Sequence, residues 1–178
     1  DMAGTDVVLN TDSTLNLDTG DPVTLGDLSL DGQLTLDTPA PSVSFGAVSG
    51  DGTVSSTGLP APTTTVRDSI APGASTGTLD FNGPLVLSDT NSDGNALGGP
   101  MTYYWELGDA GAQDLVVSTD LSILDPLTVV LMDDGAVLYE VNEFDLFQFS
   151  GTFTGSGDIN DLITLDTSLV DGLENWDT

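Results

Sequence analysis

The chain has 178 residues and a formal net charge of −28 at pH 7, because one basic residue, Arg67, stands among 29 acidic residues; Lys, His and Cys are absent. This composition excludes imidazole bases, Schiff-base amines, thiolate nucleophiles and His or Cys metal sites. Binding to nucleic acid or to anionic lipid also needs clustered Lys and Arg. We therefore expect no nucleic acid and no membrane insertion, and regard divalent cations and copies of the chain itself as the partners that the charge allows.

The composition favours a folded protein made of strands and turns. The hydrophobic fraction is 38% and the mean hydropathy is +0.08, which argue against disorder. Of the acids, 25 are Asp and four are Glu, and Asp is typical of turns, where it hydrogen-bonds its own backbone. A halophilic or marine origin accounts for the acid excess equally well. The start at Asp1, without Met, is typical of a secreted, extracellular or cell-surface protein whose signal peptide has been removed.

The chain divides into three regions. Residues 1–58 form a repetitive region of short alternating segments, in which 24–32 and 33–37 look like successive faces of one coil. Residues 59–68 are rich in Pro and Thr and predict a stiff surface loop. Residues 69–178 carry longer strands and are expected to be continuous with the first region.

Two segments of the last region carry specific expectations. Residues 103–107 should place Tyr103, Trp105 and Leu107 on one face of a strand and Tyr104 and Glu106 on the other. Residues 159–165 are expected to form a strand. No segment has a 3.6-residue period, so no helix longer than two turns is expected.

From about residue 69 onward the sequence resembles the autotransporter-associated β-strand repeat proteins of bacterial surfaces, including PEP-CTERM-type (exosortase-sorted) proteins. The resemblance lies in the order of five segments, at residues 70–79 (IAPGASTGTL), 104–107 (YWEL), 114–117 (DLVV), 147–155 (FQFSGTFTG) and 176–178 (WDT). A looser likeness covers 1–58. The resemblance implies an extracellular β-solenoid without enzymatic activity. The chain departs from the family pattern in its near-total loss of basic residues and in an apparent insertion from Asp89 to Pro100.

We predict an all-β fold, a β-solenoid or parallel β-helix. The alternative is a β-sandwich or jelly roll built from the second part, with the first part as an appended N-terminal sheet.

The insertion predicts a calcium site. Residues 89–95 (DTNSDGN) place side-chain oxygens at positions 1, 3 and 5, Gly at position 6 and a backbone carbonyl at position 7, as a Ca²⁺ loop requires. Position 12 is Pro100, where an EF-hand has a bidentate Glu, so a carboxylate from elsewhere, Asp109 or Glu106, would close the site. The alternative is an ordinary Asx-rich hairpin turn. The expected ligands are Asp89, Asn91, Asp93, Asn95 and Asp109.

Other charged residues are expected to be structural. Asp133 and Asp134 read as a turn, and Asp158, Asp161 and Asp166 as solvated strand edges. Arg67 is expected to be a structural cation that bridges carboxylates.

Enzymatic readings are weakly supported. β-Helix lyases use Arg or Lys, and only Arg67 is available. A glycosidase needs a pair of carboxylates in a cleft, and no pair stands out. A carbohydrate-binding module is the stronger rival, with an aromatic platform at residues 103–105, although alternation leaves only Tyr104 outside.

We expect a non-enzymatic extracellular structural protein, a subunit of a filament or surface layer. The open ends of a solenoid would stack head to tail on other copies through β-strand contacts, with divalent cations between the acidic faces. The alternative is a segment of a surface adhesin or a carbohydrate-binding module that contacts polysaccharide.

Overall fold

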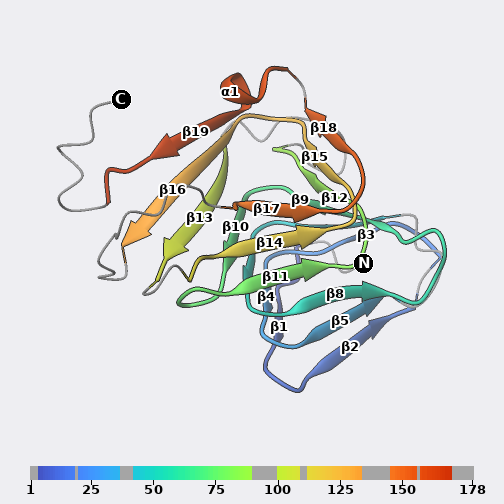
Figure 1. The fold of residues 1–178 in the computed structure, drawn as a ribbon. Helices are drawn as coiled ribbons and strands as arrows, with labels where there is room; N and C mark the ends of the chain where they lie inside the picture. The colour runs from blue at the N-terminus through green and yellow to red at the C-terminus, as the bar shows by residue number, and fades with distance from the viewer. Residues whose placement is uncertain are drawn as a thin grey trace.

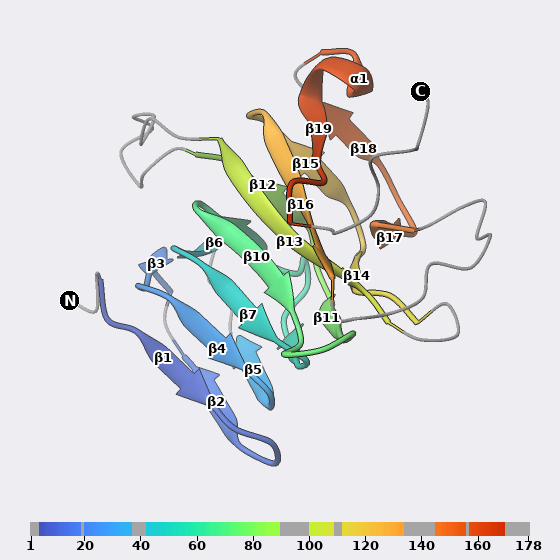
Figure 2. The ribbon, with the colours of Figure 1, turned by 90° about the vertical axis from the view of Figure 1, so that its left-hand side faces the viewer.

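The computed structural model describes residues 4–18, 20–36, 42–89, 100–108, 112–133, 145–155 and 157–169. These residues form three parallel β-sheets that wind around one core (Figures 1 and 2). The chain visits the three sheets in turn, so that one strand from each sheet makes one coil. The predicted β-solenoid is confirmed.

The first sheet has seven strands in the order β1 (Val7–Leu9), β4 (Leu28–Leu30), β7 (Val48–Gly50), β10 (Ser69–Pro72), β13 (Met101–Leu107), β16 (Leu127–Asp133) and β19 (Ile163–Asp166). The second sheet has six, in the order β17 (Phe147–Phe149), β14 (Leu115–Ser118), β11 (Thr78–Phe81), β8 (Thr53–Ser56), β5 (Gln33–Leu36) and β2 (Thr14–Leu17). The third has six, in the order β18 (Phe153–Gly155), β15 (Leu121–Ile123), β12 (Leu85–Leu87), β9 (Thr63–Val66), β6 (Ser42–Phe45) and β3 (Val23–Thr24).

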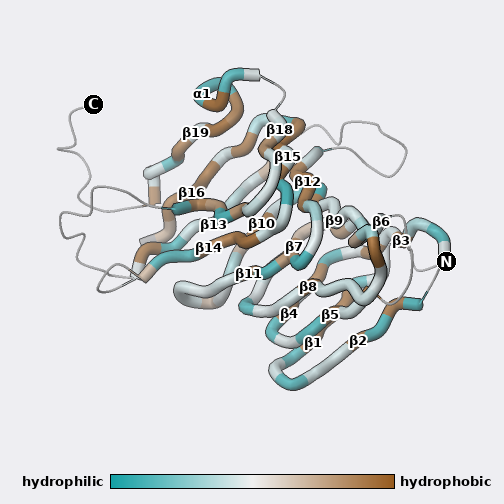
Figure 3. Tube along the Cα trace, turned by 45° about the vertical axis from the view of Figure 1, so that its right-hand side comes forward, coloured by the Kyte–Doolittle hydropathy of each residue, from teal (hydrophilic) through white to brown (hydrophobic). Residues whose placement is uncertain are grey.

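The register stacks like residues above one another. Leu28 pairs with Val7 in the coil before and with Val48 in the coil after. Inward positions form apolar columns from coil to coil, such as Leu34 next to Val54. Figure 3 colours the strands by hydropathy, with brown apolar positions recurring along neighbouring coils. In the middle coils each strand is thus buried on its inner face and more open on its outer face. The alternation seen in the sequence is the direct result of this geometry.

All the strand pairs within the three sheets are parallel, and this overturns the alternative of a β-sandwich or jelly roll. Such folds are built from antiparallel hairpins and Greek keys. Here the short turns connect strands of different sheets, so the turn-rich sequence leads to coils and not to hairpins.

The expected surface loop at 59–68 is wrong in part. Residues Thr63–Val66 form β9, in which Thr64 and Val66 are buried. β-Branched Thr and Val suit a strand, and this preference outweighed the neighbouring prolines. Leu59 remains exposed.

The expected strand at 159–165 is also wrong in part, because residues Ile159–Leu162 form the short helix α1 before β19. Asp158 caps this helix, its side chain accepting the Asn160 N–H at 3.0 Å. Asp158 therefore has a local role, and Leu162 packs into the core. Within the described residues, no helix is long and apolar enough to span a membrane.

Candidate functional site

Aspartates at the turns connect successive coils. Asp27 accepts the Ala47 backbone N–H at 2.9 Å, and its own N–H donates to Asp6 of the preceding coil at 3.0 Å. The same arrangement recurs elsewhere, with Asp51 accepting from Thr78 at 2.7 Å and Asp120 from Thr152 at 2.7 Å. The sequence predicted that Asp would bind its own turn, but these carboxylates bind backbone of the adjacent coil. This use of Asp as an acceptor explains part of the acid excess.

Glycine makes room for these carboxylates. A Cβ on Gly46 would collide with the Asp27 carboxylate, and a Cβ on Gly151 with that of Asp120. In both cases the glycine directly precedes the residue whose N–H is bound. The glycines before Ala47 and Thr152 are therefore required for close approach between coils.

Arg67 binds backbone carbonyls, whereas the sequence led us to expect that it bridges carboxylates. Its Nε donates to the Phe45 carbonyl at 3.0 Å and its guanidinium to the Leu25 carbonyl at 2.9 Å. Leu25, Phe45 and Arg67 belong to three successive coils. The planar guanidinium with its several donors fastens these coils together, which a single ammonium could not do in the same geometry.

A second cluster surrounds Asp114, a residue that is only 1% exposed. One carboxylate oxygen accepts the Gly77 N–H at 2.8 Å, and the other accepts the Glu106 N–H at 2.9 Å. The Asp114 carbonyl accepts the buried Trp105 Nε1–H at 2.9 Å. Asp114 thus ties β13 to the turn that precedes β11.

Burial is the main reason why the pKa of Asp114 is raised to about 7. The negative charges of Glu106 and Asp51 act in the same direction, while the two backbone N–H groups oppose the rise. Burial and the Asp114 charge also raise the pKa of Tyr103, whose hydroxyl donates to the Leu146 carbonyl at 3.2 Å. Nothing in the sequence indicates this cluster beyond an Asp directly before a strand.

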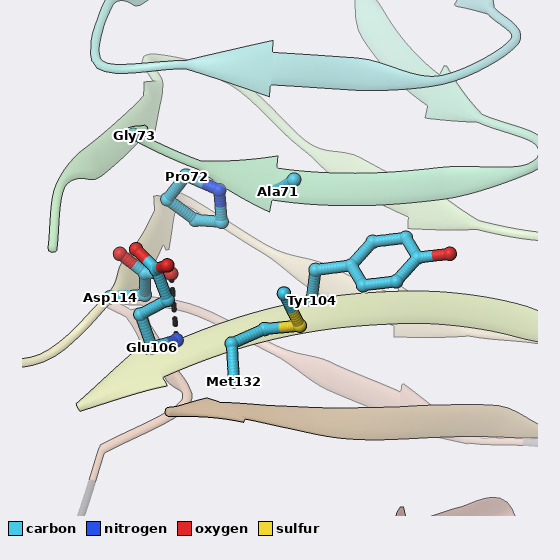
Figure 4. A pocket seen from close by; sticks show the side chains of 7 residues that line it. All are labelled: Ala71, Pro72, Gly73, Tyr104, Glu106, Asp114 and Met132. Atoms are coloured by element: carbon cyan, nitrogen blue, oxygen red, sulfur yellow. Dashed lines mark hydrogen bonds between the residues drawn. The ribbon is translucent and has the colours of Figure 1, made fainter. Parts of the chain in front are cut away.

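A pocket of about 280 Å³ lies beside Asp114 on the outer face of the first sheet. Figure 4 shows the carboxylates of Glu106 and Asp114 next to each other at one end of the pocket and the Tyr104 ring at the other. Tyr104 is 41% exposed, whereas Tyr103 is fully buried, so the predicted faces of the 103–107 strand are confirmed. The remaining lining is largely apolar and consists of Ala71, Pro72, Gly73 and Met132.

The predicted calcium ligands lie mostly outside the described residues. The structure does not describe four of them, Asn91, Asp93, Asn95 and Asp109. The fifth, Asp89, is the last described residue after β12. The Asp89 N–H donates to the Asp125 carboxylate at 2.9 Å, and the same oxygen accepts the Ser88 hydroxyl at 2.9 Å. In the described parts of the chain, no three acidic side chains are grouped as a metal site would need. The calcium site therefore stays a prediction.

The three parallel sheets and the turns that join their coils define the chain as a β-solenoid of the parallel β-helix type. Comparison with known proteins finds no matching family model, no matching curated protein and no matching solved structure.

Proposed function

We propose that the chain is a non-enzymatic extracellular structural protein, a β-solenoid that assembles end to end into a filament or surface layer. The supporting observation is the incomplete burial of the first coil. Leu15 and Leu17 are only partly buried, although they face inward, whereas their register partners Leu34 and Leu36 are at most 2% exposed. Val7 and Val23 repeat this contrast with Leu28 and Val43.

The strands of the first coil also lie at the sheet edges. β1, β2 and β3 each have a strand on one side only among the described strands. A parallel edge strand presents backbone donors and acceptors that another strand can pair with. A coil of another molecule placed there would bury the partly exposed apolar side chains of the first coil. Its strands would at the same time pair with the edge strands β1, β2 and β3.

The other end of the solenoid also exposes apolar side chains, so this end suits contact with the first coil of a second molecule. Phe149 on β17 and Leu165 on β19 are exposed, and both strands are terminal in their sheets as described. Contact between this end and the first coil of a second molecule would be heterologous. Such a contact does not close on itself and so extends into a fibre.

Acidic turns would line the sides of such a filament. At −28 per chain the lateral faces repel one another within a Debye length of about 8 Å at physiological salt. Divalent cations between neighbouring turns would offset this repulsion. The alternative, an adhesin segment or carbohydrate-binding module, is supported by one observation, the exposed Tyr104 ring in its pocket.

The substitution Leu15→Lys tests the assembly. A charge on the inner side of β2 should abolish filaments, as seen by electron microscopy and by sedimentation over a range of protein concentrations. Asn16→Lys is the matched control, because Asn16 lies on the same strand, is exposed and gives a variant of similar charge. Wild-type protein that stays monomeric at all concentrations, or filaments that persist in Leu15→Lys, would refute the proposal.

A further inference from the structure

The pocket beside Asp114 combines an apolar wall with an anionic end. Its apolar lining comes from three neighbouring strands or their turns, with Pro72 and Ala71 on β10, Tyr104 on β13 and Met132 on β16. Figure 4 shows these side chains around the space that leads to the two carboxylates. A ligand that fills it needs an apolar portion and a terminal group that suits carboxylates.

The charges that act on Asp114 at the anionic end are negative. Glu106 and Asp51 both act on Asp114 by charge repulsion. The single cation of the chain, Arg67, binds the carbonyls of Phe45 and Leu25 in earlier coils. A positively charged ligand would therefore relieve this repulsion.

The carboxylate of Asp114 is buried and keeps hydrogen-bonding capacity beyond its two backbone partners. Each of its oxygens accepts one backbone N–H, from Gly77 and from Glu106. A carboxylate oxygen carries two lone pairs, so each can accept a second hydrogen bond. A hard divalent cation is poorly served here, because it requires six or more oxygen ligands and the rest of the wall is apolar.

We propose that this pocket binds a primary ammonium group on an apolar stem. The ammonium would donate to the partly exposed carboxylate of Glu106, beside the buried carboxylate of Asp114, and the stem would lie along Pro72 and Met132. The Tyr104 ring offers a negative π-face close by. This inference does not depend on filament assembly, because the pocket lies on the outer face of the first sheet, away from the first coil.

The Lys side chain of another protein presents such a group, because its ammonium ends a flexible four-carbon stem. A second copy of this chain cannot supply a Lys side chain, because its sequence contains none. The ligand is therefore expected to come from a different molecule.

Calorimetric titration at fixed physiological ionic strength and about pH 8 tests the inference. The probes are Nα-acetyl-lysine amide and its uncharged counterpart Nα-acetyl-norleucine amide. Binding of the lysine probe, and at least about tenfold weaker binding of the norleucine probe, is expected. Failure of the lysine probe to bind, or equal binding of the norleucine probe, would overturn the proposal.

Three variants locate the site. Glu106→Gln should weaken binding of the cationic probe about tenfold, and Tyr104→Ala should weaken it as well. Asp80→Asn is the control for net charge, because Asp80 lies on β11 of the second sheet and not in the pocket. Equal losses in Asp80→Asn and Glu106→Gln would show mere attraction to a polyanion and refute the site. Unchanged thermal melting of each variant confirms that the fold is intact.

Discussion

The Asp27 carboxylate accepts the Ala47 backbone N–H at 2.9 Å, one coil further along the chain, and thereby occupies the space in which a side chain on Gly46 would stand. One residue type thus supplies the acceptor and another supplies the space. The pair makes the turn a defined contact between coils, although both residues lie near the surface.

This arrangement predicts coupling between residues 27 and 46. Asp27→Ala should lower the free energy of unfolding by about 1 kcal/mol, because it removes a charge-assisted hydrogen bond at an exposed turn. Gly46→Ala should cost roughly 1–3 kcal/mol, since the methyl group displaces the carboxylate. In the double variant the Gly46→Ala cost should shrink, because the carboxylate is gone. Urea unfolding of the four proteins measures this.

Gly20→Ala is the matched control for this cycle. A Cβ at Gly20 meets nothing within 4 Å, and Gly20 also lies in a turn of the solenoid. Its substitution should leave stability unchanged or slightly raised. Strict additivity of Asp27→Ala and Gly46→Ala would contradict the close approach.

Arg67 provides the second prediction. Arg67→Met keeps much of the apolar stem but removes both hydrogen bonds to backbone carbonyls, and should lower stability by roughly 2 kcal/mol. Arg67→Lys retains the charge but not the fork of donors, so it should recover only part of this loss. Urea unfolding at low and high salt gives the comparison. If Lys restored full stability, the charge alone, and not the bridging geometry, would be the cause.

The raised pKa of Asp114 predicts a specific pH dependence. The folded carboxyl has a pKa of about 7, whereas the unfolded one titrates near 3.9. Between about pH 4 and pH 7 the folded protein therefore binds more protons than the unfolded one, and stability falls as the pH rises. The cost of the ionised form is complete above the folded pKa and absent below the unfolded pKa.

Asp114→Asn should flatten this part of the stability curve. Asn has one oxygen and can replace only one of the two N–H acceptors, so the variant should be less stable at low pH. Its deficit should shrink as the pH rises toward 8, in urea unfolding at each pH. Asp12→Asn, in an exposed turn, controls for general repulsion. A wild-type slope that survives in Asp114→Asn would assign the titration to other carboxylates.

The loop from Asp89 to Asn95 predicts stabilisation by calcium. Ca²⁺ at about a hundredfold excess over its dissociation constant should stabilise the fold by about 2.7 kcal/mol. The melting temperature at constant ionic strength, with Ca²⁺ or with a chelator, measures this. Asp93→Ala should remove the response, while Asp12→Asn should keep it. A midpoint that neither chelation nor Asp93→Ala changes would mean an ordinary turn.

The strands were predictable because their inner and outer positions alternate so regularly. Leu34 and Leu36 face the core and Thr35 between them faces outward, as a period of two requires. The parallel stacking of the strands could also be predicted, because segments of similar length repeat along the sequence. Position 159 misled the prediction because Ile159 continues an apolar pattern, while the cap at Asp158 starts a helix.

The site was less predictable, since it depends on contacts between residues far apart in sequence. The sequence placed Tyr104 and Glu106 on one face, but nothing in it brought Asp114 to the backbone of Gly77, 37 residues away. Likewise, the partners of Arg67 are carbonyls, which every residue carries, so no motif marks them. The pattern of a single coil cannot reveal what the adjacent coil brings beside it.

The position of Arg67 also makes trypsin cleavage a measure of local opening in the middle of the solenoid. Trypsin cleaves after Arg and Lys, and this chain offers it one bond, between Arg67 and Asp68 at the start of the fourth coil. The side chain that the protease must accept is held by two carbonyls of earlier coils. Cleavage requires the centre of the solenoid to open, so the rate at which the intact mass disappears measures that opening directly. Fraying at either end would leave the chain uncut.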